Sequence, residues 1–221
     1  MPLAVRHRGS AQPAVGTLSD IEARRIEDAF FMAALQERSP EEMVGRFAEG
    51  HRAYVAFVHG QPAAWGWVAT RRATVGELGF TFEIPDGDRY LWNFVTLKAF
   101  RRMGIYRMLL DAIVEFESLE AERFWIAYAP ENHASGAGIR NAGFDTVAEL
   151  SFDAEQRAAV HSLAPGGGAL AAHMLGLPES AAPLAPCWIC VRAGRTGHAC
   201  ATGTCQCDYQ RPETAPLCGN G

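Results

Sequence analysis

Short apolar runs separated by turn residues dominate the first two thirds of the chain and predict a strand-rich fold. Expected strands cover residues 3–8, 52–58, 63–69, 76–84 and 90–95. Each run has strand length and is bounded by Gly, Pro, Asp or polar residues. The turn signals at 59–62 and 85–88 connect successive runs, so these strands are expected to begin as an antiparallel meander.

Helical spacing of apolar residues predicts three helices in the same region. Ser19 and Asp20 can cap a helix that runs to about Arg38. Its apolar side would consist of Ile21, Ile26, Phe30, Ala33 and Ala34. The sequence 39–42, Ser-Pro-Glu-Glu, combines a cap, a first-turn proline and a glutamate three residues after the cap, and predicts a helix ending near Gly50. The amphipathic segment 103–116 predicts the third helix.

Strands and helices alternate after the meander. A strand at 124–129, a helix following Asn132 and a strand at 146–152 complete the pattern. The order predicts a mixed α/β sheet of about six or seven strands flanked by helices, antiparallel at first and parallel later.

The regular pattern weakens beyond Phe152, and we expect three parts. Residues 1–152 form the main domain, 153–186 a helical and Pro-Gly-Ala-rich linker, and 187–221 a Cys-rich tail. Within the linker, 154–163 and 169–175 read as short helices, and the prolines of 178–186 indicate an extended connection.

Composition narrows the class of protein. The 221 residues carry a net charge of −5, and 48% are hydrophobic. That is enough to bury a core, while mild acidity argues against nucleic acid or a membrane surface as a partner. The N-terminal segment lacks a signal-peptide pattern and no apolar run has the length of a membrane span, so a cytoplasmic location is expected.

The segment after the 90–95 strand has the features of an anion site. Lys98, Arg101, Arg102 and Arg107 gather four cations there, and Gly104 lets the backbone approach a ligand. The unpaired N–H groups and partial positive charge at a helix start favour a phosphate. The alternative is a basic helix start on a solvated surface; the sequence is neither a P-loop nor a dinucleotide fingerprint.

Residues 95–110, VTLKAFRRMGIYRMLL, resemble the acetyl-CoA-binding motif of the GNAT-type N-acetyltransferases. That motif is a strand, then [R/Q]-x-x-G-x-[G/A], then a helix. Arg101 and Gly104 occupy the first two fixed positions, while Tyr106 stands at the third. Residues 132–144, NHASGAGIRNAGF, are similar to the family's second block, N-x-x-[AS]-x-x-x-Y-x-x-x-G-F.

The resemblance implies a sheet that splays apart after the fourth strand and binds acetyl-CoA there. The pantetheine arm would pair with the exposed strand edge, as an added strand does. Cofactor-binding residues implied in this way are Val95, Thr96, Leu97, Arg101, Arg102, Met103, Gly104, Ile105, Tyr106, Asn132 and Ser135. Backbone N–H groups around 95–97 would polarise the thioester carbonyl. Asn132 can also simply cap the following helix.

A carboxylate near the splay is the expected general base. Glu83 comes first, because Phe80, Phe82 and Ile84 could make its surroundings apolar and raise its pKa. The alternative is a solvated glutamate on a half-exposed strand. Glu77 and Glu131 are weaker candidates.

The family's usual proton donor is missing at its place. Ile139 stands where the resemblance implies a tyrosine that protonates the leaving thiolate. Tyr128, at the end of its strand, is the expected substitute, with Tyr106 as an alternative; ordinary aromatic packing, or no acid at all, stays open. Trp65, Trp67, Trp92 and Trp125 are expected in the core or in walls of an acceptor cleft.

All six cysteines lie between Cys187 and Cys218. The spacing favours Cys187, Cys190, Cys205 and Cys207 as ligands of a structural Zn²⁺, with His198 and Cys200 as replacements. Free thiols and disulfides are the alternatives.

Taken together, the sequence predicts an acetyl-CoA-dependent N-acetyltransferase with a zinc-stabilised tail. The acceptor would be the amine of a small molecule or peptide, and a homodimer is one option for the assembly. Two other functions stay open: an acyl-CoA-binding or interaction module without catalysis, and a metal-binding protein that acts through its tail.

Overall fold

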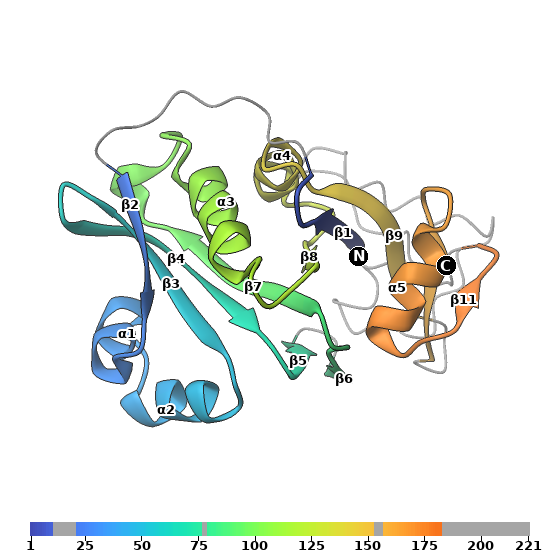
Figure 1. Ribbon diagram of the computed structural model, residues 1–221, viewed down its shortest axis with the longest axis horizontal. Helices are drawn as coiled ribbons and strands as arrows, with labels where there is room; N and C mark the ends of the chain where they lie inside the picture. Colours follow the sequence, from blue (N-terminus) through green and yellow to red (C-terminus); the bar gives the residue numbers. More distant parts are fainter. Residues whose placement is uncertain (11–20, 77–78, 153–156, 183–221) are drawn as a thin grey trace, which may run out of the picture.

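The computed structural model describes residues 1–10, 21–76, 79–152 and 157–182, and their strands are central to the fold. They are β1 (Pro2–His7), β2 (Ile21–Ile26), β3 (Arg52–Val58), β4 (Gln61–Ala69), β5 (Arg72–Val75), β6 (Phe80–Glu83), β7 (Asp88–Thr96), β8 (Arg123–Ala127), β9 (Asp145–Phe152), β10 (Ala158–Ser162) and β11 (Glu179–Ser180). Within the described residues, nine of them form one sheet, ordered β11-β10-β9-β1-β8-β7-β4-β3-β2, and β5 pairs with β6 alone (Figure 1).

The described helices are α1 (Ala29–Gln36), α2 (Pro40–Ala48), α3 (Ile105–Glu117), α4 (His133–Asn141) and α5 (Gly167–Leu175). The side chain of Asp28 caps α1, and Ser39 caps α2 just before its proline. Asn132 caps α4 by accepting from the backbone N–H of Ser135 at 3.0 Å. Side-chain oxygens at these positions satisfy N–H groups that the helix leaves unpaired.

The expected mixed α/β class is confirmed, while three local predictions are wrong. Residues 21–26 are the edge strand β2 rather than the start of a helix, because they pair antiparallel with β3 along its length. The single strand expected over 76–84 is the second half of the separate β5–β6 hairpin. The helix expected over 154–163 is instead β10, which pairs antiparallel with β9.

The described part of the expected linker over 153–186 therefore packs on the main domain through two strands and a helix. β10 and β11 extend the sheet beyond β9, and α5 packs Ala171, Met174 and Leu175 against the same core. Of this segment, residues 153–156 and 183–186 lie outside the described part, as does the whole Cys-rich tail at 187–221.

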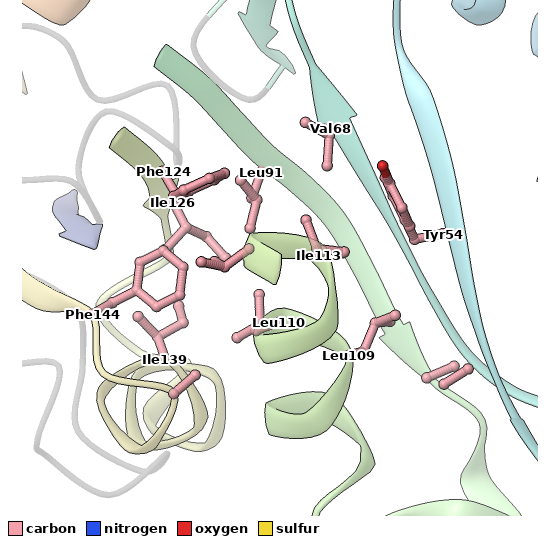
Figure 2. Packing of buried hydrophobic residues seen from close by; sticks show 14 of the residues in the cluster. Tyr54, Val68, Leu91, Leu109, Leu110, Ile113, Phe124, Ile126, Ile139 and Phe144 are labelled. Atoms are coloured by element: carbon pink, nitrogen blue, oxygen red, sulfur yellow. The ribbon is translucent and has the colours of Figure 1, made fainter. Parts of the chain in front are cut away.

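Two faces of the sheet carry different helices. On one face, α3 and α4 pack on a core that includes Leu91, Leu110 and Phe124 (Figure 2). On the other face, α1 and α2 cover Trp67 and its neighbours, while α5 and the β5–β6 hairpin cover Tyr90 and the strands nearer β9.

The sheet splays apart between β7 and β8. Their parallel pairing runs from Asp88 with Arg123 to Leu91 with Ile126. In the described part of the chain, residues 92–96 of β7 then have a strand partner on the β4 side alone. The sheet is thus splayed at the place that the family resemblance implied.

A β-bulge at the splay changes the face of the sheet on which successive β7 side chains pack. Trp65 pairs with Val95 and Trp67 with Trp92, so Gly66 faces both Asn93 and Phe94. Asn93 takes a left-handed φ of 52°. As a result, Trp92 packs on the α1–α2 face, whereas Phe94, two residues later, packs on the α3 face.

Candidate active site

The backbone loop before α3 has the geometry of an anion cradle. Arg102 has a φ of 66° and Gly104 a φ of 75°, both in the left-handed region. Consecutive N–H groups in such turns converge, and Gly104 leads directly into the first turn of α3. Residues 101–104 are all exposed, and the Arg101 N–H donates to the Lys98 carbonyl. The predicted phosphate site therefore has suitable backbone.

The open edge of β7 lies next to this loop. The Leu97 N–H donates to the Ala63 carbonyl of β4 at 2.9 Å, so it is not available to a thioester as we had expected. Because neighbouring residues of a strand point to opposite sides, the N–H and C=O of Thr96 face the open edge. Consistently, the Thr96 carbonyl accepts from Arg101 Nε at 3.2 Å.

The remaining members of the cofactor set are divided between ligand surface and core. Ile105 is 1% exposed and belongs to the core, as does Ile139 on α4 (Figure 2). Tyr106 packs its ring edge-on to Phe94 at 5.6 Å and shares a 3.3 Å hydrogen bond with the Ser135 hydroxyl. Burial raises the pKa of Tyr106 to about 12, so this phenol stays protonated.

Two glycines of α4 make room for the two tyrosines at the splay. A Cβ on Gly138 would lie 2.5 Å from the Tyr106 ring, and one on Gly136 would lie 2.8 Å from the Tyr128 ring. The Tyr128 hydroxyl is 3.3 Å from that of Thr146. Tyr128 also borders the cleft described below, although its ring packs on the α4 side of the sheet.

A cleft of about 960 Å³ opens on the sheet face opposite α3 and α4. Its walls come from the end of α1 and from α2, from the β5–β6 hairpin, from β7 and from the end of β8. The lining residues include Arg38, Arg46, Glu49, His51, Arg72, Tyr90, Trp92, Asn93 and Tyr128. Its size suits a small molecule or a peptide end. Because Asn93 and Tyr128 line it, the cleft reaches the splay.

Aromatic rings and one arginine form the floor of this cleft. The Arg46 guanidinium lies 5.0 Å from the Trp67 ring centre and 4.7 Å from that of Trp92. It also pairs with Glu42 at 2.7 Å and donates to Gln36 Oε1 at 3.4 Å. Burial lowers the pKa of Arg46. Cation–π contact and the ion pair fix this side chain in place.

His51 is buried beside Trp92, with both ring nitrogens in contact with neighbours. The Trp92 indole donates to His51 Nδ1 at 3.2 Å, and His51 Nε2 lies 3.5 Å from Glu49. Burial lowers the pKa of His51, which favours the neutral ring. An indole nitrogen can only donate, so the lone pair of His51 Nδ1 is already occupied. This nitrogen cannot take a proton from the substrate amine unless Trp92 moves.

Glu83 does not have the apolar surroundings that its neighbours suggested. Its side chain is 79% exposed and lies 3.6 Å from Arg72 Nε. Phe82 and Ile84, on either side, point into the core instead. Glu131 is described but does not line the cleft, and Glu77 lies outside the described residues.

Sequence reasoning missed the residues that shape the acceptor side. Arg38, Arg46, Glu49 and His51 carry no motif, and they come from the α1–α2 region rather than from the family blocks. The sequence signal near these residues was the strong cap at Ser39. That cap predicts a helix but does not indicate which face of the helix lines a site.

The unpaired edge of β7 and the loop before α3 suit a ligand with a diphosphate and an extended amide arm. The family model described as the acetyltransferase (GNAT) family matches residues 21–144. The chain belongs to this family of acetyl-CoA-dependent N-acetyltransferases.

The solved structures that match the chain are distant in sequence. The ribosomal-protein-S18-alanine N-acetyltransferase from Escherichia coli is 17% identical, with a TM-score of 0.46 over 60% of this chain and 82% of its own. A GNAT-family acetyltransferase from Streptococcus pneumoniae is 16% identical, with a TM-score of 0.44 over 59% of this chain and 88% of its own. Glucosamine-6-phosphate N-acetyltransferase from Arabidopsis thaliana is 15% identical, with a TM-score of 0.36 over 53% of this chain and 88% of its own. No curated protein matches the chain.

Two searches of the described residues bear on membranes and metals. No described helix is long and apolar enough to cross a membrane. The described residues contain no group of three or more His, Cys, Asp or Glu side chains arranged to hold a metal ion. The four predicted zinc ligands, Cys187, Cys190, Cys205 and Cys207, lie outside the described part.

Proposed function

We propose that the chain transfers the acetyl group of acetyl-CoA to a primary amine of a small molecule or peptide that enters the 960 Å³ cleft. The observation that carries this proposal is the position of the cleft. It meets the splay at Asn93 and Tyr128, on the opposite face from the anion cradle. Donor and acceptor can therefore approach the same point from two sides, which is the alignment that direct transfer requires.

The donor side consists mainly of backbone. The N–H groups of residues 102–106 would hold the diphosphate, and the Thr96 N–H and C=O would pair with the amide arm. Asn132 and Ser135 would border that arm, although their side chains already bond within the protein. Bound in this way, the coenzyme supplies an activated thioester, and the protein supplies position and hydrogen-bond donors.

Tyr128 is our choice for protonating the leaving thiolate. Its ring packs beside Gly136 of α4, on the donor side, and the residue also borders the cleft at the splay, whereas Tyr106 does not border the cleft. A thiolate leaves readily, so we assign Tyr128 a modest rather than an essential contribution.

Glu49 competes with Glu83 for the role of base. Among the described residues, Glu49 is the carboxylate that lines the cleft, and it is 69% exposed. Glu83 borders the same space through its ion pair with Arg72. Comparing Glu49→Gln with Glu83→Gln in kcat/KM across pH separates them: the base is the residue whose variant loses the alkaline rise in rate. If both variants keep the alkaline rise in rate, neither carboxylate is the base, and the amine loses its proton to water.

A second function has one observation in its favour. Ile139 is buried in the core, so no hydroxyl reaches the donor from the family's usual position. A non-catalytic acyl-CoA-binding module would share every donor-side feature described above.

The test is acetyl-CoA-dependent thiol release over a panel of primary amines, alongside calorimetry with coenzyme A. We expect binding and amine-dependent release. Binding without release on any amine would support the non-catalytic module, and no binding would contradict both.

The zinc prediction for the tail rests on sequence alone. We propose a structural Zn²⁺ held by Cys187, Cys190, Cys205 and Cys207. Metal analysis should find about one zinc per chain, lost in Cys187→Ser. A metal-free protein with unchanged stability in that variant would remove this proposal.

A further inference from the structure

Arginine side chains from three separate segments line the acceptor cleft. Arg38 follows α1, Arg46 lies on α2, and Arg72 begins β5. Against these cations the described lining contains one carboxylate, Glu49, and a histidine whose pKa burial lowers. The lining is therefore cationic, although the whole chain carries a net charge of −5.

The three arginines differ in how well their charges are balanced. Arg46 has a close partner in Glu42. Arg72 pairs with Glu83 over 3.6 Å, and both side chains are more than half exposed. Such a pair is weak and can readily exchange its carboxylate for a ligand's. Within the described segments, no carboxylate lies within ion-pair distance of Arg38.

Arg38 and Arg46 also repel each other. Burial lowers the pKa of Arg46, and the positive charge of Arg38 lowers it further, against the opposing effect of Glu42. Two like charges held at the wall of a concave site cost free energy that an anion between or beside them would relieve. Guanidinium groups are suited to this because they offer several fixed donors to carboxylate or phosphate oxygens.

We propose that the acceptor is a primary amine bearing an anionic group, carboxylate or phosphate, which Arg38 and Arg72 bind at the cleft wall. This inference rests on the proposed acetyl transfer and adds the acceptor's chemical class. Arg46, already paired and stacked, contributes positive potential and holds the aromatic floor in place. The amine would then lie toward the splay, near Tyr128.

The experiment uses three amines that share a two-carbon arm: ethanolamine, β-alanine and phosphoethanolamine. Initial rates of thiol release give kcat/KM for each. We expect β-alanine, phosphoethanolamine or both to exceed ethanolamine by about three- to tenfold at low salt, a preference that salt reduces. Comparing the two anionic amines distinguishes carboxylate from phosphate recognition.

Arg38→Gln and Arg72→Gln should each reduce that preference. Arg8→Gln is the matched control, because Arg8 is 50% exposed, pairs loosely with Glu122 at 3.7 Å and does not line the cleft. Equal kcat/KM for the three amines, or an unchanged preference in both cleft variants, would overturn the inference and leave acetyl transfer standing.

If no amine supports release, the proposed transfer fails, and calorimetry with phosphoethanolamine still decides the inference. Binding that weakens in Arg38→Gln but not in Arg8→Gln would support the anion site. Equal binding in all proteins, or none, would contradict it.

Discussion

The two faces of the sheet are built in different ways for the two substrates. The donor side is compact in sequence: residues 95–106 supply the open edge and the anion cradle, largely through backbone. The acceptor cleft collects side chains from α1, α2, the β5–β6 hairpin, β7 and β8. In the proposed arrangement, main-chain groups would bind the coenzyme, while dispersed side chains would define the acceptor.

The largest expected effect concerns the buried carboxylate at the end of α3, the helix that follows the proposed coenzyme loop. Glu117, at its end, has a side chain with no exposed surface and bonds to Arg52, Arg89 and Tyr54. Glu117→Gln should lower the free energy of unfolding by about 3 kcal/mol, because it removes the buried carboxylate that Arg52, Arg89 and Tyr54 share, although Glu120 still pairs with both arginines. Glu120→Gln, which removes an exposed partner of the same arginines, should cost less than about 1 kcal/mol.

The Glu117 effect should depend on pH in a defined direction. Burial alone would raise the pKa of this carboxyl, but hydrogen bonds from Tyr54, Arg89 and Arg52 outweigh it and lower the pKa below 4.5. The stabilisation is therefore complete above pH 4.5 and lost as pH falls through the folded-state pKa. Denaturant unfolding of the unsubstituted protein and of Glu117→Gln at several pH values measures this stabilisation. A difference in unfolding free energy that grew on acidification would contradict the assignment.

The anion cradle can be broken without touching the acceptor cleft. Gly104→Glu forces a side chain into a left-handed φ of 75° and adds a negative charge beside the diphosphate. Affinity for coenzyme A, measured by calorimetry, should fall by about 100-fold or more. Gly60→Glu is the control, since its φ is 77° and a Cβ there meets open space. Equal losses in the two variants would point to general strain.

The bulge between the two faces can be tested with one methyl group. A Cβ on Gly66 would lie 2.1 Å from the Phe94 ring, so Gly66→Ala should displace that ring and cost about 2 kcal/mol of unfolding free energy. Coenzyme affinity should fall with it. Gly45→Ala, in α2 with open space around its Cβ, should be neutral or stabilising. A Gly66→Ala protein with normal stability and affinity would show that the bulge is adaptable.

The smallest expected effect separates the two tyrosines. Tyr128→Phe should lower kcat by about tenfold with little change in KM for acetyl-CoA, because one proton donor to a good leaving group is removed. Tyr106→Phe should instead act mainly on KM for acetyl-CoA, since that residue packs against Phe94 beside the donor edge. The reverse pattern would exchange their roles.

The sequence predicted the strand–turn–helix order of residues 95–106 correctly because its determinants are local, while the coenzyme-binding role of this segment stays a proposal. Gly104, the basic residues around it and the strand–turn–helix order lie within one short segment. The α2 cap at Ser39 and the α4 cap at Asn132 were also readable, since a cap depends on the next three residues. Long-range pairing was not readable. Residues 21–26 and 158–162 became strands because β3 and β9 offered edges to them.

The acceptor side could not be predicted for the same reason. Arg38 and Arg72 are ordinary surface arginines in the sequence, and they share a cleft only because α1 and the β5–β6 hairpin border the same sheet face. Glu83 illustrates the opposite error. Its apolar neighbours suggested burial, but alternation along β6 turns their side chains inward and its own outward.

The extra residue in β7 allows one strand to contribute side chains to both faces of the sheet. Without it, Trp92 and Phe94 would project to the same side, as residues two apart in a regular strand do. With the extra residue, the segment before Asn93 contributes to the cleft, and Phe94 packs on the α3 face, beside the proposed coenzyme site. Substitutions at Tyr90 or Trp92 are therefore expected to change acceptor choice while the Phe94 side of the same strand keeps its packing.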